Sequence, residues 1–130
     1  MSSIDNRPVF LNLFRIHQPV TAVLSIIHRI SGVLMVLLLP GLVYLLNLSL
    51  TDQAGFAVVA SLLTSPLLKA VALLLCWALT YHILAGIRFM LLDFDVAIER
   101  NAARMTAWFV HLCATLVAIL AGGLLFGGLF

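Results

Sequence analysis

Three long stretches of this chain carry no charged side chain. They cover residues 30–51, 70–87 and 105–130, and each begins directly after a basic residue. An α-helix needs roughly 20 mostly apolar residues to cross the hydrocarbon of a membrane. Backbone amide groups must pair with one another in lipid, which also favours helices. The pattern therefore predicts an all-α membrane protein with three transmembrane helices.

Proline and serine mark the expected ends of these helices. We expect the helices at about 20–48, 66–92 and 103–129. Pro66 suits a first helical turn, where its missing N–H costs nothing, and Ser65 is the expected N-cap. Pro40 lies inside the first helix and is expected to bend it. The short apolar stretch 55–64 is expected to lie at the outer membrane interface.

The charge composition excludes a water-soluble globular monomer. Only 9% of the residues are charged and 64% are hydrophobic, whereas a soluble domain has about a quarter charged residues. No nucleic-acid partner is expected, because the net charge is only +2 and no lysine or arginine cluster is present. Cys76 and Cys113 both lie in apolar runs, so neither a disulfide framework nor a zinc site is indicated.

The basic residues predict the orientation in the membrane. Six arginines lie before or at the start of the first helix or around the second connection, and only Lys69 falls on the opposite side. The positive-inside rule then places the N-terminus in the cytoplasm and the C-terminus in the periplasm. The second connection also carries three acidic residues, Asp93, Asp95 and Glu99, beside Arg88, Arg100 and Arg104. We expect this mixed cluster to be a solvated face or a docking surface for a soluble partner.

A polar group interrupts the start of the first helix. Ser25, His28, Arg29 and Gly32 occur in the run SIIHRISG, and on a helix with 3.6 residues per turn they share one face. Polar groups near membrane depth are functional candidates. Their donors suit a quinone carbonyl or an acidic headgroup. The alternative is an arginine–histidine pair that reaches lipid phosphate without a specific ligand.

Two histidines lie deeper in the predicted spans. His82 precedes Arg88 by six residues, which places it roughly 9 Å deeper. Its helical neighbours Ala78, Ala85 and Gly86 are small. Small residues give a flat macrocycle clearance beside a metal-ligating histidine, but they also serve helix packing. His111 has a similar depth, so a bis-histidine haem within the chain is conceivable, although a hydrogen bond to a neighbouring helix is the preferred interpretation.

Two of these motifs occur together with a third in one known family. The three segments are RPVFLNL at Arg7–Leu13, SIIHRISG at Ser25–Gly32 and HILAGIRFMLLD at His82–Asp93. In these motifs and in its three-helix layout the chain resembles the larger cytochrome b membrane-anchor subunit of bacterial succinate dehydrogenase. The resemblance covers nearly the whole chain, which implies a single transmembrane anchor domain over residues 1–130 in the inner (cytoplasmic) membrane.

The resemblance implies a role for four residues. His82 would be an axial ligand of one haem b, whose second histidine ligand comes from the smaller anchor subunit. Ser25 and Arg29 would line the ubiquinone site, and His28, with Arg29, would lie near a haem propionate. Many family members have a histidine after the helix-2 arginine, whereas this chain has Phe89. The propionate must then be met by His28, Arg29 or the partner chain.

The resemblance also implies partners and a reaction. The chain would pack against helices of the second anchor subunit and carry an iron–sulfur subunit and a flavoprotein subunit. It would have no succinate-oxidising site of its own, and would pass electrons from succinate oxidation to ubiquinone in the tricarboxylic acid cycle and respiratory chain. The alternatives are the anchor of a fumarate reductase, and a structural membrane anchor or small transporter subunit without a cofactor.

Overall fold

The structure is a computed structural model that describes residues 17–127, and this part of the chain contains helices joined by short turns and no strand. Its helices are α1 (Val20–Thr51), α2 (Gln53–Leu63), α3 (Pro66–Asp93) and α4 (Arg100–Phe126). Three of them, α1, α3 and α4, are long and apolar enough to cross a membrane, so the predicted fold class is confirmed. The motif at Arg7–Leu13 lies outside the described residues, and so does Arg15.

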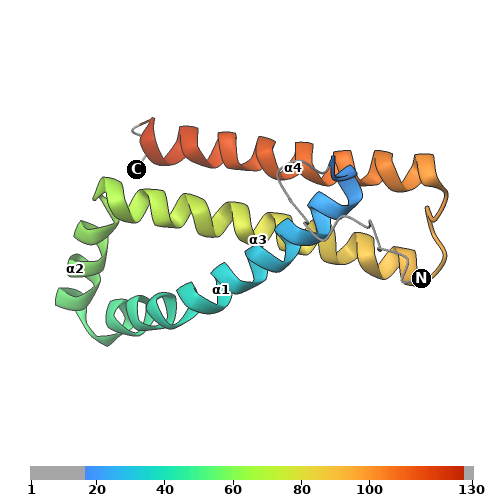
Figure 1. The fold of residues 1–130 in the computed structure, drawn as a ribbon. Helices are drawn as coiled ribbons and strands as arrows, with labels where there is room; N and C mark the ends of the chain where they lie inside the picture. Colours follow the sequence, from blue (N-terminus) through green and yellow to red (C-terminus); the bar gives the residue numbers. More distant parts are fainter. Residues whose placement is uncertain (1–16, 128–130) are drawn as a thin grey trace, which may run out of the picture.

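The three long helices share two ends (Figure 1). α3 and α4 run side by side, and α1 packs across α3 and reaches α4 near its own start. The start of α1, the end of α3 and the start of α4 lie at one end of the bundle, while α2 runs across the other. Basic and acidic residues of the second connection therefore lie far from Lys69 and α2. In the same view, the second half of α1, which contains Pro40, runs in a different direction from the first half.

The helix α2 was not predicted as a helix. The first helix extends to Thr51, and Asp52 breaks it with an extended backbone, φ −162° and ψ 178°. The Asp52 side chain then caps α2 by accepting a hydrogen bond of 2.6 Å from the Gly55 N–H. Gly55 is buried, and a Cβ at this position would clash with the Leu48 carbonyl. An aspartate cap and a close backbone approach therefore produce a sharp turn between α1 and α2.

The other helix ends agree with the expected ones within a few residues. Ser65 caps α3 by accepting a hydrogen bond of 3.3 Å from the Leu68 N–H, as predicted. The last long helix begins at Arg100, three residues earlier than expected, and ends at Phe126. Lys69 Nζ donates to the Leu125 carbonyl at 2.6 Å. This bond joins the start of α3 to the end of α4 and satisfies one of the carbonyls that a helix end leaves free.

The core between the long helices is small and rich in alanine. The buried cluster consists of Leu24, Tyr81, Ala85, Ala107, Val110 and Ala114. Alanines allow helix backbones to approach closely, which drives packing where lipid is as apolar as leucine. Ala78 and Ala85 are both fully buried, so these two small neighbours of His82 serve helix packing, one of the two alternatives above. Large apolar side chains elsewhere remain exposed, as expected for a surface covered by lipid or by other membrane helices.

Arg88 does not belong to the solvated charge cluster in which the sequence placed it. The side chain is 6% exposed. Its Nε donates to Thr106 Oγ1 and its Nη2 to the Ala103 carbonyl, both at 3.0 Å. A buried charge is tolerated only when its donors are satisfied. Arg88 therefore joins the end of α3 to the start of α4 by hydrogen bonds. Asp93, Asp95 and Glu99 are exposed.

Candidate functional site

A groove of about 480 Å³ lies between α1 and α3, and we call it the His82 groove. Its lining consists of His28, Arg29, Gly32, Val33, Val36, Leu37 and His82. The structure thus brings the histidine of α3 together with three of the four polar-face residues predicted on α1. The remainder of the wall is aliphatic. Such a groove suits a flat apolar ligand that has a few polar anchor points.

The imidazole of His82 is held on its Nδ1 side by α1. This nitrogen lies 3.2 Å from the His28 carbonyl oxygen and 3.2 Å from Ser31 Oγ. Ser31 is fully buried, and its hydroxyl donates to the same carbonyl at 2.7 Å. A carbonyl oxygen can only accept, so Nδ1 carries the proton. Within the described residues no protein group is hydrogen-bonded to Nε2, which keeps a free lone pair.

The close approach of the His82 imidazole to α1 depends on Gly32. The rings of His28 and His82 stack with centroids 4.1 Å apart and an interplanar angle of 19°. A Cβ on Gly32 would come within 3.0 Å of His82 Cε1 and 3.4 Å of Nδ1. A larger residue would therefore push the imidazole away from the carbonyl and hydroxyl that hold it.

His28 contributes a second imidazole whose Nε2 is buried. Among the described residues, His28 Nε2 is the one buried side-chain nitrogen or oxygen that lacks a hydrogen-bond partner. The ring of Phe89 lies 5.2 Å from the His28 ring, and a Cβ on Gly86 would lie 3.8 Å from Nε2. Leaving a buried polar group unpaired is costly. The described residues therefore leave this nitrogen without a partner, and the neighbouring Phe89 ring cannot provide one.

Arg29 and Ser25 lie one turn apart at the N-terminal end of the His82 groove. The Arg29 guanidinium is exposed, and its Nη2 lies 3.4 Å from Ser25 Oγ. This distance is long for a hydrogen bond, so both side chains keep donors for another group. Arg29 lines the groove, whereas Ser25 lies next to it.

His111 belongs to a different environment. Its Nδ1 lies 3.1 Å from the hydroxyl of Tyr81, which is buried between α3 and α4. This contact agrees with the preferred interpretation of a histidine hydrogen-bonded to a neighbouring helix. Tyr81 and His82 are adjacent on α3, yet one faces α4 and the other faces α1. No group of three or more metal-ligating side chains occurs in the described part of the chain.

Ser31 is the residue of this site that the sequence analysis did not single out. Its position was visible in the run SIIHRISG, three residues after His28. A serine at this spacing on a helix can donate back to a carbonyl of the preceding turn. Its contact with His82 could not be deduced, because that contact depends on how α1 crosses α3.

Fold and site together define an all-helical membrane protein with three candidate spans and a histidine-bearing groove between α1 and α3. The family described as succinate dehydrogenase/fumarate reductase transmembrane subunit matches residues 3–122. The chain belongs to this family, the membrane anchors of respiratory complex II.

Curated relatives agree with this assignment. The succinate dehydrogenase cytochrome b556 subunit of Coxiella burnetii is 32% identical over 117 residues, covering 89% of this chain and 94% of the relative. The subunit of the same name from Rickettsia typhi is 28% identical over 116 residues, covering 89% and 90%. A succinate dehydrogenase hydrophobic membrane anchor subunit of Archaeoglobus fulgidus is 30% identical over 78 residues, covering 60% of this chain and 67% of the relative.

Proposed function

We propose that this chain is the haem b- and quinone-binding anchor of a succinate dehydrogenase in a bacterial inner membrane. Its N-terminus would be cytoplasmic, its C-terminus periplasmic, and residues 1–130 would form one anchor domain. The observation that carries the proposal is the His82 imidazole, whose Nδ1 is engaged by α1 and whose Nε2 lone pair is free. A partner fixed on one ring nitrogen is the usual arrangement for a metal-ligating histidine.

The residues of the His82 groove fit a b-type haem. His82 would donate its Nε2 lone pair to the iron, and a histidine of the smaller anchor subunit would complete the axial pair. When bound, such a bis-imidazole haem supplies a one-electron redox centre without an open position for oxygen. The aliphatic wall of Val33, Val36 and Leu37 would keep water from the ring.

His28 and Arg29 would meet the charge of a haem propionate. The support is the buried, unpartnered His28 Nε2 and the free guanidinium of Arg29 at the same groove. An arginine fork matches the two oxygens of a carboxylate. Phe89 packs beside His28 at the position where many family members have a histidine, so the propionate contact would fall to His28, Arg29 or the partner chain.

Ser25 and Arg29 would bind ubiquinone at the same end of α1. Their side chains lie together, and each has donors to offer. The Ser25 hydroxyl and the Arg29 guanidinium would hydrogen-bond a quinone carbonyl oxygen. A fixed positive charge at that oxygen stabilises the negative charge that develops as the quinone is reduced. Arg29 would therefore serve both the propionate and the quinone.

The partners follow from the same proposal. A second, smaller anchor subunit would cover the open side of the His82 groove, where Val36 and Leu37 are each 70% exposed. An iron–sulfur subunit and a flavoprotein subunit would dock at the end that carries the starts of α1 and α4. Succinate would be oxidised on these partner subunits, and its electrons would reach the quinone through the iron–sulfur subunit.

Replacing His82 with leucine tests the haem assignment. In the assembled complex, His82→Leu should abolish the low-spin bis-imidazole haem spectrum, because leucine has no lone pair to donate. His111→Leu is the matched control, since this histidine lies at a similar depth and bonds Tyr81. The control should retain the spectrum. An unchanged low-spin spectrum in His82→Leu would contradict the assignment.

Replacing Arg29 tests the quinone role. Arg29→Ala should lower quinone reduction by at least about tenfold, the order expected when a charged hydrogen bond to the reacting oxygen is lost. Succinate oxidation with an artificial acceptor should change little, since that reaction bypasses the anchor. Arg29→Lys, which keeps the charge, should recover part of the quinone activity. Equal losses in both assays would argue against a quinone-site role.

A further inference from the structure

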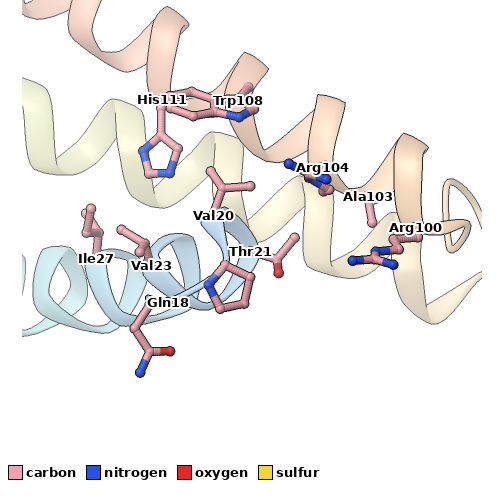
Figure 2. Close-up of a pocket in the computed structure, with 11 residues that line it drawn as sticks. Gln18, Val20, Thr21, Val23, Ile27, Arg100, Ala103, Arg104, Trp108 and His111 are labelled. Carbon is pink, nitrogen blue, oxygen red and sulfur yellow. The ribbon is translucent and has the colours of Figure 1, made fainter. Parts of the chain in front are cut away.

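A second groove, of about 820 Å³, lies between the start of α1 and the first half of α4, and we call it the α1–α4 groove. Figure 2 shows Arg100, Arg104 and Trp108 along α4, facing Val20, Val23 and Ile27 of α1. Gln18, Pro19, Thr21, Ala103 and His111 complete the lining. As formed by the described residues, the groove is open, and its wall changes from charged at one end to mostly apolar at the other.

The α1–α4 groove is separate from the proposed haem and quinone site. None of its lining residues lines the His82 groove. On α1, Val20, Val23 and Ile27 follow helical spacing and occupy the face opposite Ser25 and Arg29. A ligand in the α1–α4 groove would therefore bind independently of the proposed haem and quinone.

Two arginines supply the charged end of the α1–α4 groove. Arg100 and Arg104 are four residues apart on α4, which places them on one face, and both are exposed. Within the described residues neither side chain is hydrogen-bonded or ion-paired. The starts of α1 and α4 lie at this end as well, and neither has a side-chain cap. All of these features favour a negatively charged group.

Apart from His111, whose Nδ1 lies 3.1 Å from the Tyr81 hydroxyl, the rest of the groove is apolar and extends toward the middle of the spans. Val23, Ile27 and Trp108 form its walls, and Trp108 is 56% exposed. Tryptophan favours the headgroup level of a membrane. Trp108 lies one turn beyond Arg104, so the charged end opens at the surface and the apolar walls run into the hydrocarbon. A free phosphate or a soluble anion would leave these walls uncovered.

We propose that the α1–α4 groove binds an anionic glycerophospholipid. The Arg100 and Arg104 guanidinium groups hydrogen-bond the phosphate oxygens, and Gln18 and Thr21 face the glycerol region. One acyl chain lies along Val23 and Ile27 against the Trp108 ring. This single ligand matches the charge, the depth and the length of the groove.

Tryptophan quenching by brominated lipid tests the proposal directly. The full-length chain carries two tryptophans, so a Trp77→Phe background leaves Trp108 as its reporter. The chain is reconstituted in phosphatidylcholine vesicles containing a minority of phosphatidylglycerol, with bromine on the acyl chains of one lipid or the other. Brominated phosphatidylglycerol should quench Trp108 fluorescence more strongly per molecule than brominated phosphatidylcholine. Each arginine should contribute about fivefold to this preference.

Variants at the two ends of the bundle separate a site from general charge attraction. Arg100→Gln and Arg104→Gln should each lower the preference about fivefold, and the double variant should abolish it. Lys69→Gln removes the same charge at the opposite end and should leave the preference intact. Circular dichroism checks that each variant keeps its helices. Equal quenching by both lipids, a preference that survives the double variant, or an equal loss in Lys69→Gln would overturn the proposal.

Two further measurements address other occupants of the α1–α4 groove. Inorganic phosphate added in excess should not reverse the quenching, and its doing so would indicate a phosphate site rather than a lipid site. In the assembled complex, the Trp108 contribution is the difference between the parent and a Trp108→Phe variant. It should remain open to quenching by brominated phosphatidylglycerol. A Trp108 that neither lipid reaches there would mean that a protein segment covers the groove, which would also overturn the proposal.

Discussion

Replacing Gly32 with alanine should weaken haem binding although Gly32 touches no iron in the proposed site. The new Cβ would lie 3.0 Å from His82 Cε1, whereas ordinary contacts begin near 3.4 Å. The imidazole must therefore move away from α1 by about 0.4 Å. Its two Nδ1 contacts, at 3.2 Å, also go to α1 and would lengthen beyond hydrogen-bonding distance.

The size of the effect follows from those two contacts. Forcing a methyl group into a packed contact costs about 1–3 kcal/mol, and loss of the partners that orient a metal ligand lowers metal affinity about 10–100-fold. We therefore expect Gly32→Ala complexes to lose haem during purification, with at least a tenfold weaker affinity. The assay is haem content per complex by pyridine haemochrome, together with the low-spin signal in electron paramagnetic resonance.

Gly41 provides the matched control on the same helix. A Cβ on Gly41 would meet no atom within 4 Å. Gly41→Ala should therefore leave haem content unchanged and stabilise the helix by no more than about 1 kcal/mol. If Gly32→Ala kept its haem content and spectrum at the level of Gly41→Ala, the Nδ1 contacts would not be what positions the His82 imidazole.

Two further predictions concern the buried side chains of Ser31 and Arg88. Ser31→Ala removes one Nδ1 contact but leaves the His28 carbonyl, so haem should remain bound with a shifted midpoint potential, and Ser31→Thr should restore the original value. An unchanged potential in Ser31→Ala would argue against positioning by this hydroxyl. Arg88→Gln should lower the midpoint of thermal unfolding in detergent, because it weakens two buried bonds from a charged donor that are worth about 1.5–3 kcal/mol each. Thr106→Val removes only one of these bonds and should lower the unfolding midpoint less. Equal midpoints in the wild type and Arg88→Gln would show that Arg88 does not stabilise the contact between α3 and α4.

The sequence predicted the long helices well because membrane depth constrains them so strongly. Uncharged runs that begin after Arg29, Lys69 and Arg104 are long enough to cross a membrane as helices. The sequence did not predict α2, since a mostly apolar stretch of eleven residues fits several structures equally well. The turn before α2 depends on one capping bond from Asp52, a local detail that hydropathy does not reveal.

The site was predicted in part, for a related reason. Helical spacing places His28, Arg29 and Gly32 on one face, and the structure brings them to one groove. Spacing along one helix cannot reveal a partner on another, so the contact between Ser31 and His82 was missed. Arg88 was misjudged because charge near the end of a span is usually solvated. Its burial depends on a hydroxyl and a carbonyl that α4 brings within reach.

We expect the proposed haem and quinone sites to be coupled through α1. Both groups that face His82 Nδ1 belong to α1, namely the His28 carbonyl and the Ser31 hydroxyl, and Arg29 lies on the same turn. A tilt or rotation of this turn would move the His82 hydrogen bonds and the Arg29 guanidinium together, because one stretch of backbone carries them all. Occupation of the quinone site should therefore shift the haem midpoint potential in the wild-type complex. The shift should be smaller in Ser31→Ala, where one of the two connections is missing. An equal shift in both proteins would mean that the quinone affects the haem through its charge alone.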